Sequence, residues 1–225
     1  MFVRDLAAGT NTTFGNVSNF DWTDKGTFLA MTIDAENRTA NGVLVFDPAT
    51  GALRTLDNGD ATYAGLSWRK DDDDLAVLKT AVHEAYEDTS NVIIAFRDLA
   101  SAKYAKHVFD HTKASGYPAD MRVVSFRALS WSDDGNAIFF GIKERDRKPP
   151  KAQPVVASAG AGDATQMKSS QDSAARKAAA EEPAGVEVWH SKDVDIIPTQ
   201  KVRANFDRNF NYLAAWHLSG DSFVQ

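Results

Sequence analysis

The sequence is organised in short apolar blocks separated by polar turns, and one order of blocks returns along the chain. An apolar segment ends in a Trp, a polar turn follows, and a second apolar run comes after the turn. The unit is complete at Trp22, Trp68 and Trp131, where the runs 28–31, 75–78 and 137–140 follow, and a shortened form surrounds Trp216. Asp and Gly favour tight turns, and the flanking aliphatic and aromatic residues suit half-buried strands, so each unit predicts an antiparallel hairpin.

A second unit alternates with the Trp unit and consists of a strand that runs into Asp, a small turn and another strand. It occurs at Asp5, Asp47 and Asp98, with a weaker version over residues 188–193. Two hairpins in each period give four antiparallel strands, which make up one blade of a β-propeller. The predicted fold is therefore all-β, a β-propeller fragment of about three four-stranded antiparallel blades plus partial blades at both ends.

The distances between the Trp residues show where the repeat is interrupted. Trp22 and Trp68 are 46 residues apart (68 − 22), an ordinary blade length, whereas the next intervals are 63 (131 − 68) and 85 (216 − 131). The second interval carries the polar stretch 110–122, whose Gly116 and Pro118 predict a long loop between blades. The third interval carries residues 148–185, and removing about 37 residues from it would restore an ordinary blade of about 48.

Residues 148–185 are rich in Ala, Gly, Pro and charge and contain few bulky apolar side chains. Such a segment buries too little apolar surface to offset the entropy of ordering, so we expect a flexible insertion within the third blade, with a transient helix over 173–182. The expected organisation is propeller blades over 1–147, the insertion over 148–185, and propeller blades again over 186–225. Because both ends match half of a blade, we expect a fragment, and closure of a small ring by the two ends is the alternative.

The composition excludes several classes of function. The chain has 225 residues with 43% hydrophobic content, and its 31 acidic and 25 basic residues leave a formal net charge of -6. Positive charge is not concentrated in a stripe that would attract phosphates, so we expect no nucleic-acid partner. The chain also has no run of about 18 apolar residues, so we expect no membrane span. The lack of cysteine excludes disulfides and thiolate metal sites but leaves the compartment open.

Residues of the kinds that carry chemistry are present, but their patterns favour structural roles. The four consecutive aspartates of 71–74 lack the alternate spacing of a calcium loop and predict a solvated hairpin turn. His107 and His111 stand where a strand is expected to run into a loop, which disfavours a metal pair. Turn chemistry also explains the serines near the Trp units, Ser67, Ser130 and Ser219. We therefore predict no catalytic, cofactor-binding or metal-binding residue in this chain, and no cofactor.

The recurring Trp residues are explained best by packing between adjacent blades, since they return at one place in each blade. A role in stacking on a ligand is the alternative. The acidic segment 84–88 is expected in the loop between the two hairpins of the second blade. If one surface of the chain meets the positive N-terminus of a substrate, we expect it to be this segment, although charged loop tips are usually only solvated.

The chain resembles a known family over nearly its whole length outside the insertion. The stretches 20–56 and 186–202 and the Trp-Ser-Asp-Asp-Gly turn at 131–135 are similar to the N-terminal propeller of bacterial serine peptidases of the prolyl oligopeptidase family, of the dipeptidyl aminopeptidase or acylaminoacyl-peptidase kind. The resemblance implies a seven- or eight-bladed propeller that gates access to a C-terminal α/β-hydrolase domain with a Ser, Asp, His triad. It also favours a periplasmic or secreted location over a cytoplasmic one.

That triad cannot be placed in this chain, because the Gly-x-Ser-x-Gly pentapeptide of the family's nucleophile does not occur in its 225 residues. Two functions remain. In the first, the chain is the non-catalytic propeller portion of a serine peptidase, and its partners are the C-terminal α/β-hydrolase domain of the same parent chain and short peptide substrates. In the second, it is a protein-binding propeller module, Tol-associated or WD-like, with no enzymatic partner domain.

Overall fold

The computed structural model describes residues 1–36, 38, 40–148, 192 and 194–225, which fall into two compact units. The first unit comprises 1–148 and 210–225 and contains all the strands named below. The second unit comprises 149–209 and contains the helix α2 (Ile197–Arg208). Among the described residues, no helix is long and apolar enough to cross a membrane.

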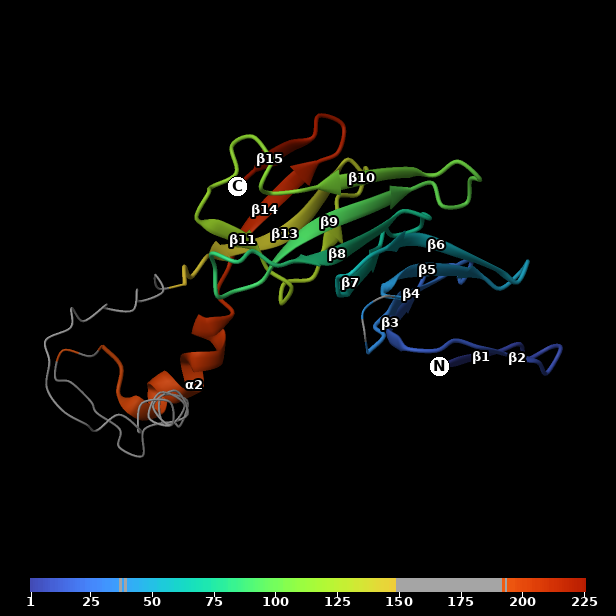
Figure 1. The fold of residues 1–225 in the computed structure, drawn as a ribbon, viewed down its shortest axis with the longest axis horizontal. Helices are drawn as coiled ribbons and strands as arrows, with labels where there is room; N and C mark the ends of the chain where they lie inside the picture. Colours follow the sequence, from blue (N-terminus) through green and yellow to red (C-terminus); the bar gives the residue numbers. More distant parts are fainter. Residues whose placement is uncertain (37, 39, 149–191, 193) are drawn as a thin grey trace, which may run out of the picture. The chain divides into compact units, whose positions relative to one another are not determined.

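The strands of the first unit form successive antiparallel sheets, which Figure 1 shows in sequence order from blue to red. The hairpin of β1 (Phe2–Arg4) and β2 (Asn11–Thr13) comes first. The first blade follows with β3 (Val17–Trp22), β4 (Leu29–Ile33), β5 (Gly42–Asp47) and β6 (Ala52–Asn58). The second blade has β7 (Tyr63–Trp68), β8 (Leu75–Ala81), β9 (Ser90–Arg97) and β10 (Ala105–Phe109). The predicted all-β, propeller-like fold is therefore confirmed.

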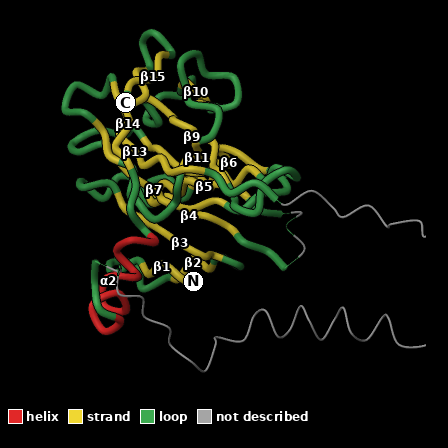
Figure 2. The backbone as a smooth tube through the Cα atoms, turned by 90° about the vertical axis from the view of Figure 1, so that its left-hand side faces the viewer, coloured by secondary structure: helices red, strands yellow, loops and turns green. Residues whose placement is uncertain are grey.

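The third blade has a first strand in two pieces. β11 (Met121–Val123) and β12 (Ser130–Trp131) both pair with β13 (Ala137–Glu144), and β14 (Tyr212–His217) and β15 (Ser222–Val224) complete the sheet. The first strands of the other blades, β3 and β7, contain only a shift of register. The predicted long loop between the second and third blades is present over 110–120, because β10 ends at Phe109 and β11 begins at Met121. Figure 2 shows the strands of the first unit from a second direction.

The expectation that Trp216 belongs to the first hairpin of a fourth blade is wrong. Trp216 lies on β14 opposite Ile138 of β13, so residues 210–225 supply the second hairpin of the third blade. The same spacing of five residues links an Asn to a buried aromatic residue in each blade, Asn41 to Phe46, Asn91 to Phe96 and Asn211 to Trp216. Trp216 is therefore equivalent to Phe46 and Phe96, and its resemblance to the other Trp units comes only from the polar turn that follows it.

The range 186–225 was expected to contain only blade strands, and the structure corrects this over 197–208. These residues form α2, which carries Pro198 in its first turn, where proline suits a helix, and buries none of its residues. The expected insertion over 148–185 lies outside the described residues except for Lys148, and the weak hairpin expected over 188–193 lies outside them except for Lys192. The chain between β13 and β14 thus runs from 145 to 211.

The inner strands of the second blade bury both faces because this blade lies between the first and the third blades. In β8, Leu75 and Val77 belong to the apolar cluster shared with the first blade, whereas Ala76 and Leu78 belong to the cluster shared with the third. Successive side chains of a strand point to opposite faces, so a strand that is covered on both sides needs an unbroken apolar run. This is the physical reason for the run 75–78 that follows Trp68 in the sequence.

The Asp units at Asp5 and Asp47 form tight turns between antiparallel strands, as the sequence predicts. Asp47 Oδ1 accepts hydrogen bonds from the amides of Ala49 and Thr50, and Gly51 has a φ of 74°, which favours glycine. The turn after β1 is built in the same way, since Asp5 Oδ1 accepts the amides of Ala7 and Ala8. The turn at Asp47 joins β5 to β6 at one edge of the first blade, and the turn at Asp5 joins β1 to β2.

Candidate functional site

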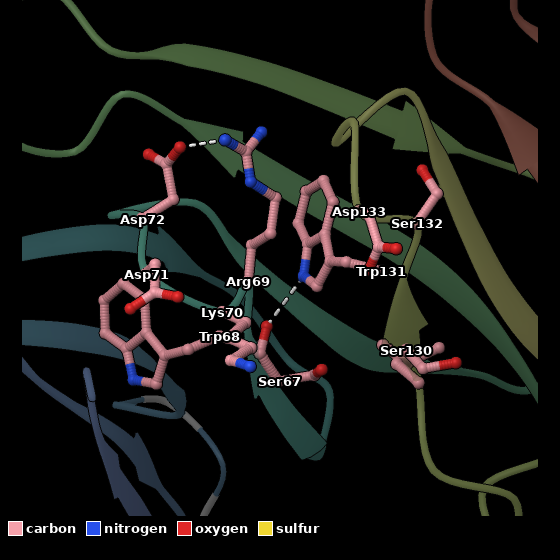
Figure 3. Close-up of a pocket in the computed structure, with 11 residues that line it drawn as sticks. Ser67, Trp68, Arg69, Lys70, Asp71, Asp72, Ser130, Trp131, Ser132 and Asp133 are labelled. Carbon is pink, nitrogen blue, oxygen red and sulfur yellow. Dashed lines mark hydrogen bonds and ion pairs between the residues drawn. The ribbon is translucent and has the colours of Figure 1, made fainter.

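The second and third blades meet at their Trp hairpins and leave a groove between them, the Trp groove (Figure 3). It has a volume of about 690 Å³ and is lined by 67–72 and 129–133. Trp68 and Trp131 contribute aromatic surface, and Lys70 and Asp71 contribute charge. Concave sites with aromatic walls and a few polar groups are typical of ligand binding, so this groove is the first candidate for a functional site.

Hydrogen bonds tie the Trp side chains of the groove to the preceding blade. Trp68 Nε1 donates to the carbonyl oxygen of Asp21 at 3.1 Å, and Trp131 Nε1 donates to the carbonyl oxygen of Ser67 at 3.0 Å. Asp21 and Ser67 each stand directly before the Trp of their own blade, so the same contact is repeated at both joints. The predicted role of these Trp residues in packing between blades is confirmed, and the hydrogen bond to the backbone is an addition that the sequence did not reveal.

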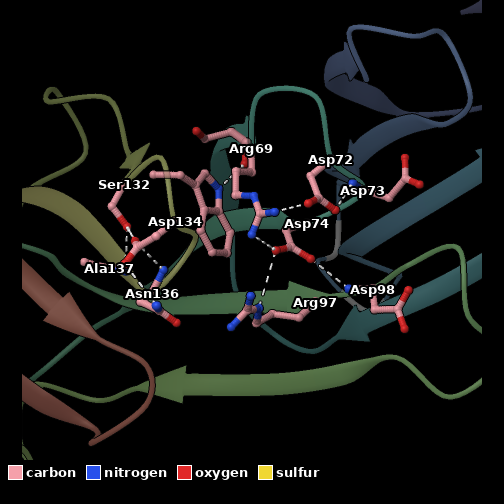
Figure 4. Close-up of polar contacts among 12 residues, drawn as sticks. Arg69, Asp72, Asp73, Asp74, Arg97, Asp98, Ser132, Asp134, Asn136 and Ala137 are labelled. Carbon is pink, nitrogen blue, oxygen red and sulfur yellow. Dashed lines mark hydrogen bonds and ion pairs between the residues drawn. The ribbon is translucent and has the colours of Figure 1, made fainter.

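Asp74 is the buried charge of the second blade that holds Arg69, whose guanidinium reaches Gly135 of the third blade (Figure 4). It is 3% exposed, pairs with Arg69 at 3.0 Å and Arg97 at 3.4 Å, and accepts the amide of Asp98 at 2.8 Å. Buried charges are tolerated where they are paired and hydrogen-bonded in this way. The prediction of a solvated aspartate turn is therefore right for the exposed Asp71 and wrong for Asp74.

The Trp turn of the third blade is shaped to receive the Arg69 guanidinium. Gly135 has a φ of 68°, which favours glycine, and a Cβ atom at this position would overlap the Arg69 side chain. In the same turn, Asp134 accepts hydrogen bonds from the Ser132 hydroxyl and the Asn136 amide, which lower the pKa of Asp134 to about 2. The serine that makes side-chain hydrogen bonds within this turn is thus Ser132, whereas Ser67 and Ser130 lie on the strands β7 and β12.

At the opposite end of the blades, a buried Asn crosses each joint. Asn41 Nδ2 donates to the carbonyl oxygen of Ala61 at 3.0 Å, and Asn91 Nδ2 donates to that of Val123 at 2.8 Å. Both side chains reach the backbone beside the first strand of the next blade. Sequence reasoning missed this pair, although their separation of 50 residues (91 − 41) matches the blade period.

A second cavity, the Arg145 pocket, lies at this Asn end of the joint between the second and third blades. It has a volume of about 250 Å³ and is lined by the loop before β9, the loop before β11 and the residue after β13, with His83, Tyr86, His111, Tyr117 and Arg145 as its larger side chains. The Arg145 guanidinium lies over the Tyr86 ring at 3.6 Å from its centroid. The side chain of Arg145 is only 4% exposed.

Several buried polar atoms of this region have no hydrogen-bond partner among the described residues. They are Arg145 Nε and Nη2, Arg122 Nε, Asp88 Oδ1, His111 Nδ1 and the Tyr117 hydroxyl. Asp88 faces both guanidinium groups, at 3.4 Å from Arg145 Nε and 3.4 Å from Arg122 Nε. One carboxylate therefore faces two arginines, and the buried group as a whole keeps one positive charge.

Ser90 forms a hydrogen bond with His111, which lines this pocket, and the pair has a structural role. Ser90 Oγ lies 3.2 Å from His111 Nε2 and also accepts the amide of Val123, which ties β9 to β11. Ser90 is 1% exposed, so no substrate carbonyl can reach its hydroxyl. Burial, followed by the nearby charge of Arg145, lowers the pKa of His111, which favours the neutral ring.

The structure also places the other residues that the sequence singled out. The acidic segment 84–88 lies between β8 and β9 as expected, but Asp88 is turned toward Arg122 and Arg145 and is only partly exposed. His107 lies on β10, whereas His111 lies in the loop that follows and is buried. In the part of the chain that the structure describes, no group of three or more His, Cys, Asp or Glu residues is arranged to hold a metal ion.

The repeated Trp and Asn contacts and the two-sided packing of the sheets define the class of this protein as all-β and propeller-like. No family model and no curated protein matches the chain. Among solved structures, it is similar to the hydrazine synthase of Kuenenia stuttgartiensis, with 14% sequence identity and a TM-score of 0.40. The alignment covers 64% of this chain and 45% of that chain, so it spans less than half of the hydrazine synthase chain.

Proposed function

We propose that this chain is the non-catalytic propeller portion of a serine peptidase, and that it gates the access of short peptides to a C-terminal α/β-hydrolase domain of the same parent chain. The peptidase part of the proposal is supported by the sequence resemblance of residues 20–56, 186–202 and 131–135. The gating part is supported by the propeller-like blades, since a ring of such blades surrounds a central channel.

The observation that carries the non-catalytic part is the use of reactive side chains in structural contacts within and between the blades. Asp74 forms ion pairs with Arg69 and Arg97. The Ser132 hydroxyl donates a hydrogen bond to Asp134 and accepts one from the amide of Ala137. Ser90 is 1% exposed and is hydrogen-bonded to the amide of Val123 and to His111. A serine hydrolase needs an accessible hydroxyl with a positioned His and backbone donors aimed at the oxyanion, and these groups already serve the fold.

The proposal is tested by comparing the 225-residue chain with its full-length parent. We expect the chain alone to hydrolyse neither peptide nor ester substrates, and we expect the parent to cleave short peptides and to be labelled by a fluorophosphonate. The parent should carry a Gly-x-Ser-x-Gly motif at a strand-to-helix turn beyond Gln225, followed by Asp and His.

The two halves of the proposal fail separately. Hydrolysis by the purified chain that is lost in Ser90→Ala or Ser130→Ala would contradict the non-catalytic role. A parent without fluorophosphonate labelling and without that motif would contradict the peptidase assignment and would favour the protein-binding propeller.

A further inference from the structure

The Arg145 region holds most of the buried polar side-chain atoms that lack a hydrogen-bond partner among the described residues, and the remaining one is Arg69 Nε. Arg145 is 4% exposed at its side chain and lines the pocket, and neither its Nε nor its Nη2 has a hydrogen-bond partner among the described residues. A buried donor without a partner is costly, so native proteins rarely retain one without a reason. An accepting ligand is one such reason.

The charge of the pocket points to an anion. Arg145 and Arg122 share the single carboxylate of Asp88, at 3.4 Å from each Nε, so one positive charge has no counter-ion at close range among the described residues. The side chains of Arg122 and Asp88 are 18% and 12% exposed, so solvent screens this charge only weakly. Asp88 occupies the Nε side of Arg145, which leaves Nη2 for a further acceptor.

The remaining lining shows which anion fits. Tyr117 lines the same pocket, and its buried hydroxyl has no hydrogen-bond partner in the part of the chain that the structure describes, so it supplies a second donor. Around these donors lie the rings of Tyr86, His83 and His111 and the side chain of Met121, which are surfaces for an apolar body. A planar carboxylate matches a guanidinium edge and a hydroxyl, whereas a phosphate would bring a second charge that one free cation does not balance.

We propose that the Arg145 pocket binds the carboxylate of a ligand with an apolar or aromatic body, with Arg145 and the Tyr117 hydroxyl as its donors. The volume of about 250 Å³ lies below the range of about 300 to 1,000 Å³ typical of drug-sized ligands, so the pocket holds about one amino-acid residue. The carboxylate belongs either to a small free acid or to the C-terminal residue of a peptide. This inference does not depend on the peptidase proposal.

The test is ligand-observed NMR with N-acetylphenylalanine and its amide on the full chain at low micromolar concentration. We expect the acid to bind and the amide, which lacks the charge, to bind at least tenfold more weakly. Equal binding of acid and amide, no binding of the acid, or equally strong binding of inorganic phosphate would overturn the proposal. An acetylated tetrapeptide that ends in Phe separates the two sources, because equal affinity assigns a peptide C-terminus and exclusion assigns a small free acid.

Two variants locate the binding in the pocket. Tyr117→Phe removes one hydroxyl and no packing, and we expect it to weaken the binding of the acid about five- to tenfold. The matched control is Tyr104→Phe, since Tyr104 packs against the core between the first and second blades and should leave binding unchanged. Arg145→Gln should abolish the preference for the acid over the amide. Unchanged binding in Tyr117→Phe, or equal losses in the two Tyr variants, would contradict the assigned site.

Discussion

Arg69 and Arg145 lie at opposite ends of the joint between the second and third blades, and their surroundings differ. Arg69 is 17% exposed at its side chain and pairs with Asp72 and Asp74. Arg145 is 4% exposed and has Asp88 at 3.4 Å without a hydrogen bond. The more deeply buried arginine is thus the less well satisfied one. The contrast favours a structural role for Arg69 and agrees with the proposed ligand-binding role of Arg145.

The joint between the first and second blades shows how the Asn end of a joint can be satisfied. There Asp57 binds Tyr63, Lys79 and Lys106, with 2.6 Å to the Tyr63 hydroxyl and 2.8 Å to the Lys79 ammonium. The two lysine side chains are 28% and 38% exposed, so water reaches the positive charge that Asp57 does not balance. The corresponding charge in the Arg145 pocket is carried by a guanidinium that water scarcely reaches.

The largest effect is expected from removing the acid that satisfies Arg69. Asp74→Ala leaves Arg69 and Arg97 without their buried partner and should lower the free energy of unfolding by about 3 to 5 kcal/mol, measured by urea denaturation. The control is Asp72→Ala, whose side chain is 40% exposed and whose loss should cost less than about 1 kcal/mol. Similar small losses in the two variants would show that Asp74 does not hold this joint together.

A smaller effect is expected from the two buried tyrosine hydroxyls. Tyr63→Phe removes a hydrogen bond to the Asp57 carboxylate and should lower the free energy of unfolding by about 1 to 2 kcal/mol. Tyr117→Phe removes a hydroxyl without a partner and should change it by less than about 0.5 kcal/mol in the absence of ligand. Urea denaturation of both variants at the same pH tests these two predictions. A larger loss of unfolding free energy in Tyr117→Phe than in Tyr63→Phe would mean that the Tyr117 hydroxyl stabilises the fold.

Asp57 makes the satisfied joint sensitive to acid. Burial acts to raise the pKa of Asp57, but hydrogen bonds from Lys106, Lys79 and Tyr63 outweigh burial and hold the pKa below its ordinary value. A carboxyl with a depressed pKa in the folded state stabilises the fold above the pKa of the unfolded chain, about 3.9, and loses this contribution as the pH falls through the folded pKa. We therefore expect stability to fall below about pH 4, and Asp57→Asn to make that fall shallower in pH-dependent denaturation.

The sequence predicts those features of the fold that depend on residues close together in the chain. The hairpin at Asp47 and the apolar run 75–78 follow from turn chemistry and from two-sided burial, and both were readable as patterns. Trp216 was misplaced because an aromatic residue before a polar turn is common to both hairpins of a blade. Its distance from Asn211 distinguishes the two, but the role of that Asn becomes evident only when Asn41 and Asn91 are seen to cross the joints.

The candidate site was beyond the reach of sequence patterns for a related reason. Tyr117 and Arg145 are 28 residues apart (145 − 117), and Tyr86 lies in the preceding blade. Their spacing in the sequence therefore does not predict that they line the same pocket. Nor does a run of four aspartates tell which of them is buried, because Asp74 is selected by its position at the start of β8, beside Arg69 and Arg97. Burial of a charge depends on tertiary neighbours rather than on residue type.

The account's central claim is that Arg69 is needed by the fold and Arg145 is not. Urea denaturation of Arg69→Met and Arg145→Met, side by side and without ligand, tests it most directly. We expect Arg69→Met to lower the free energy of unfolding by at least about 2 kcal/mol, because the buried Asp74 loses its hydrogen-bonded guanidinium at 3.0 Å and keeps only Arg97 at 3.4 Å. Arg145→Met should change it by less than about 1 kcal/mol, since Asp88 keeps Arg122 and the Met side chain still packs on Tyr86. An equal or larger loss in Arg145→Met would contradict the claim.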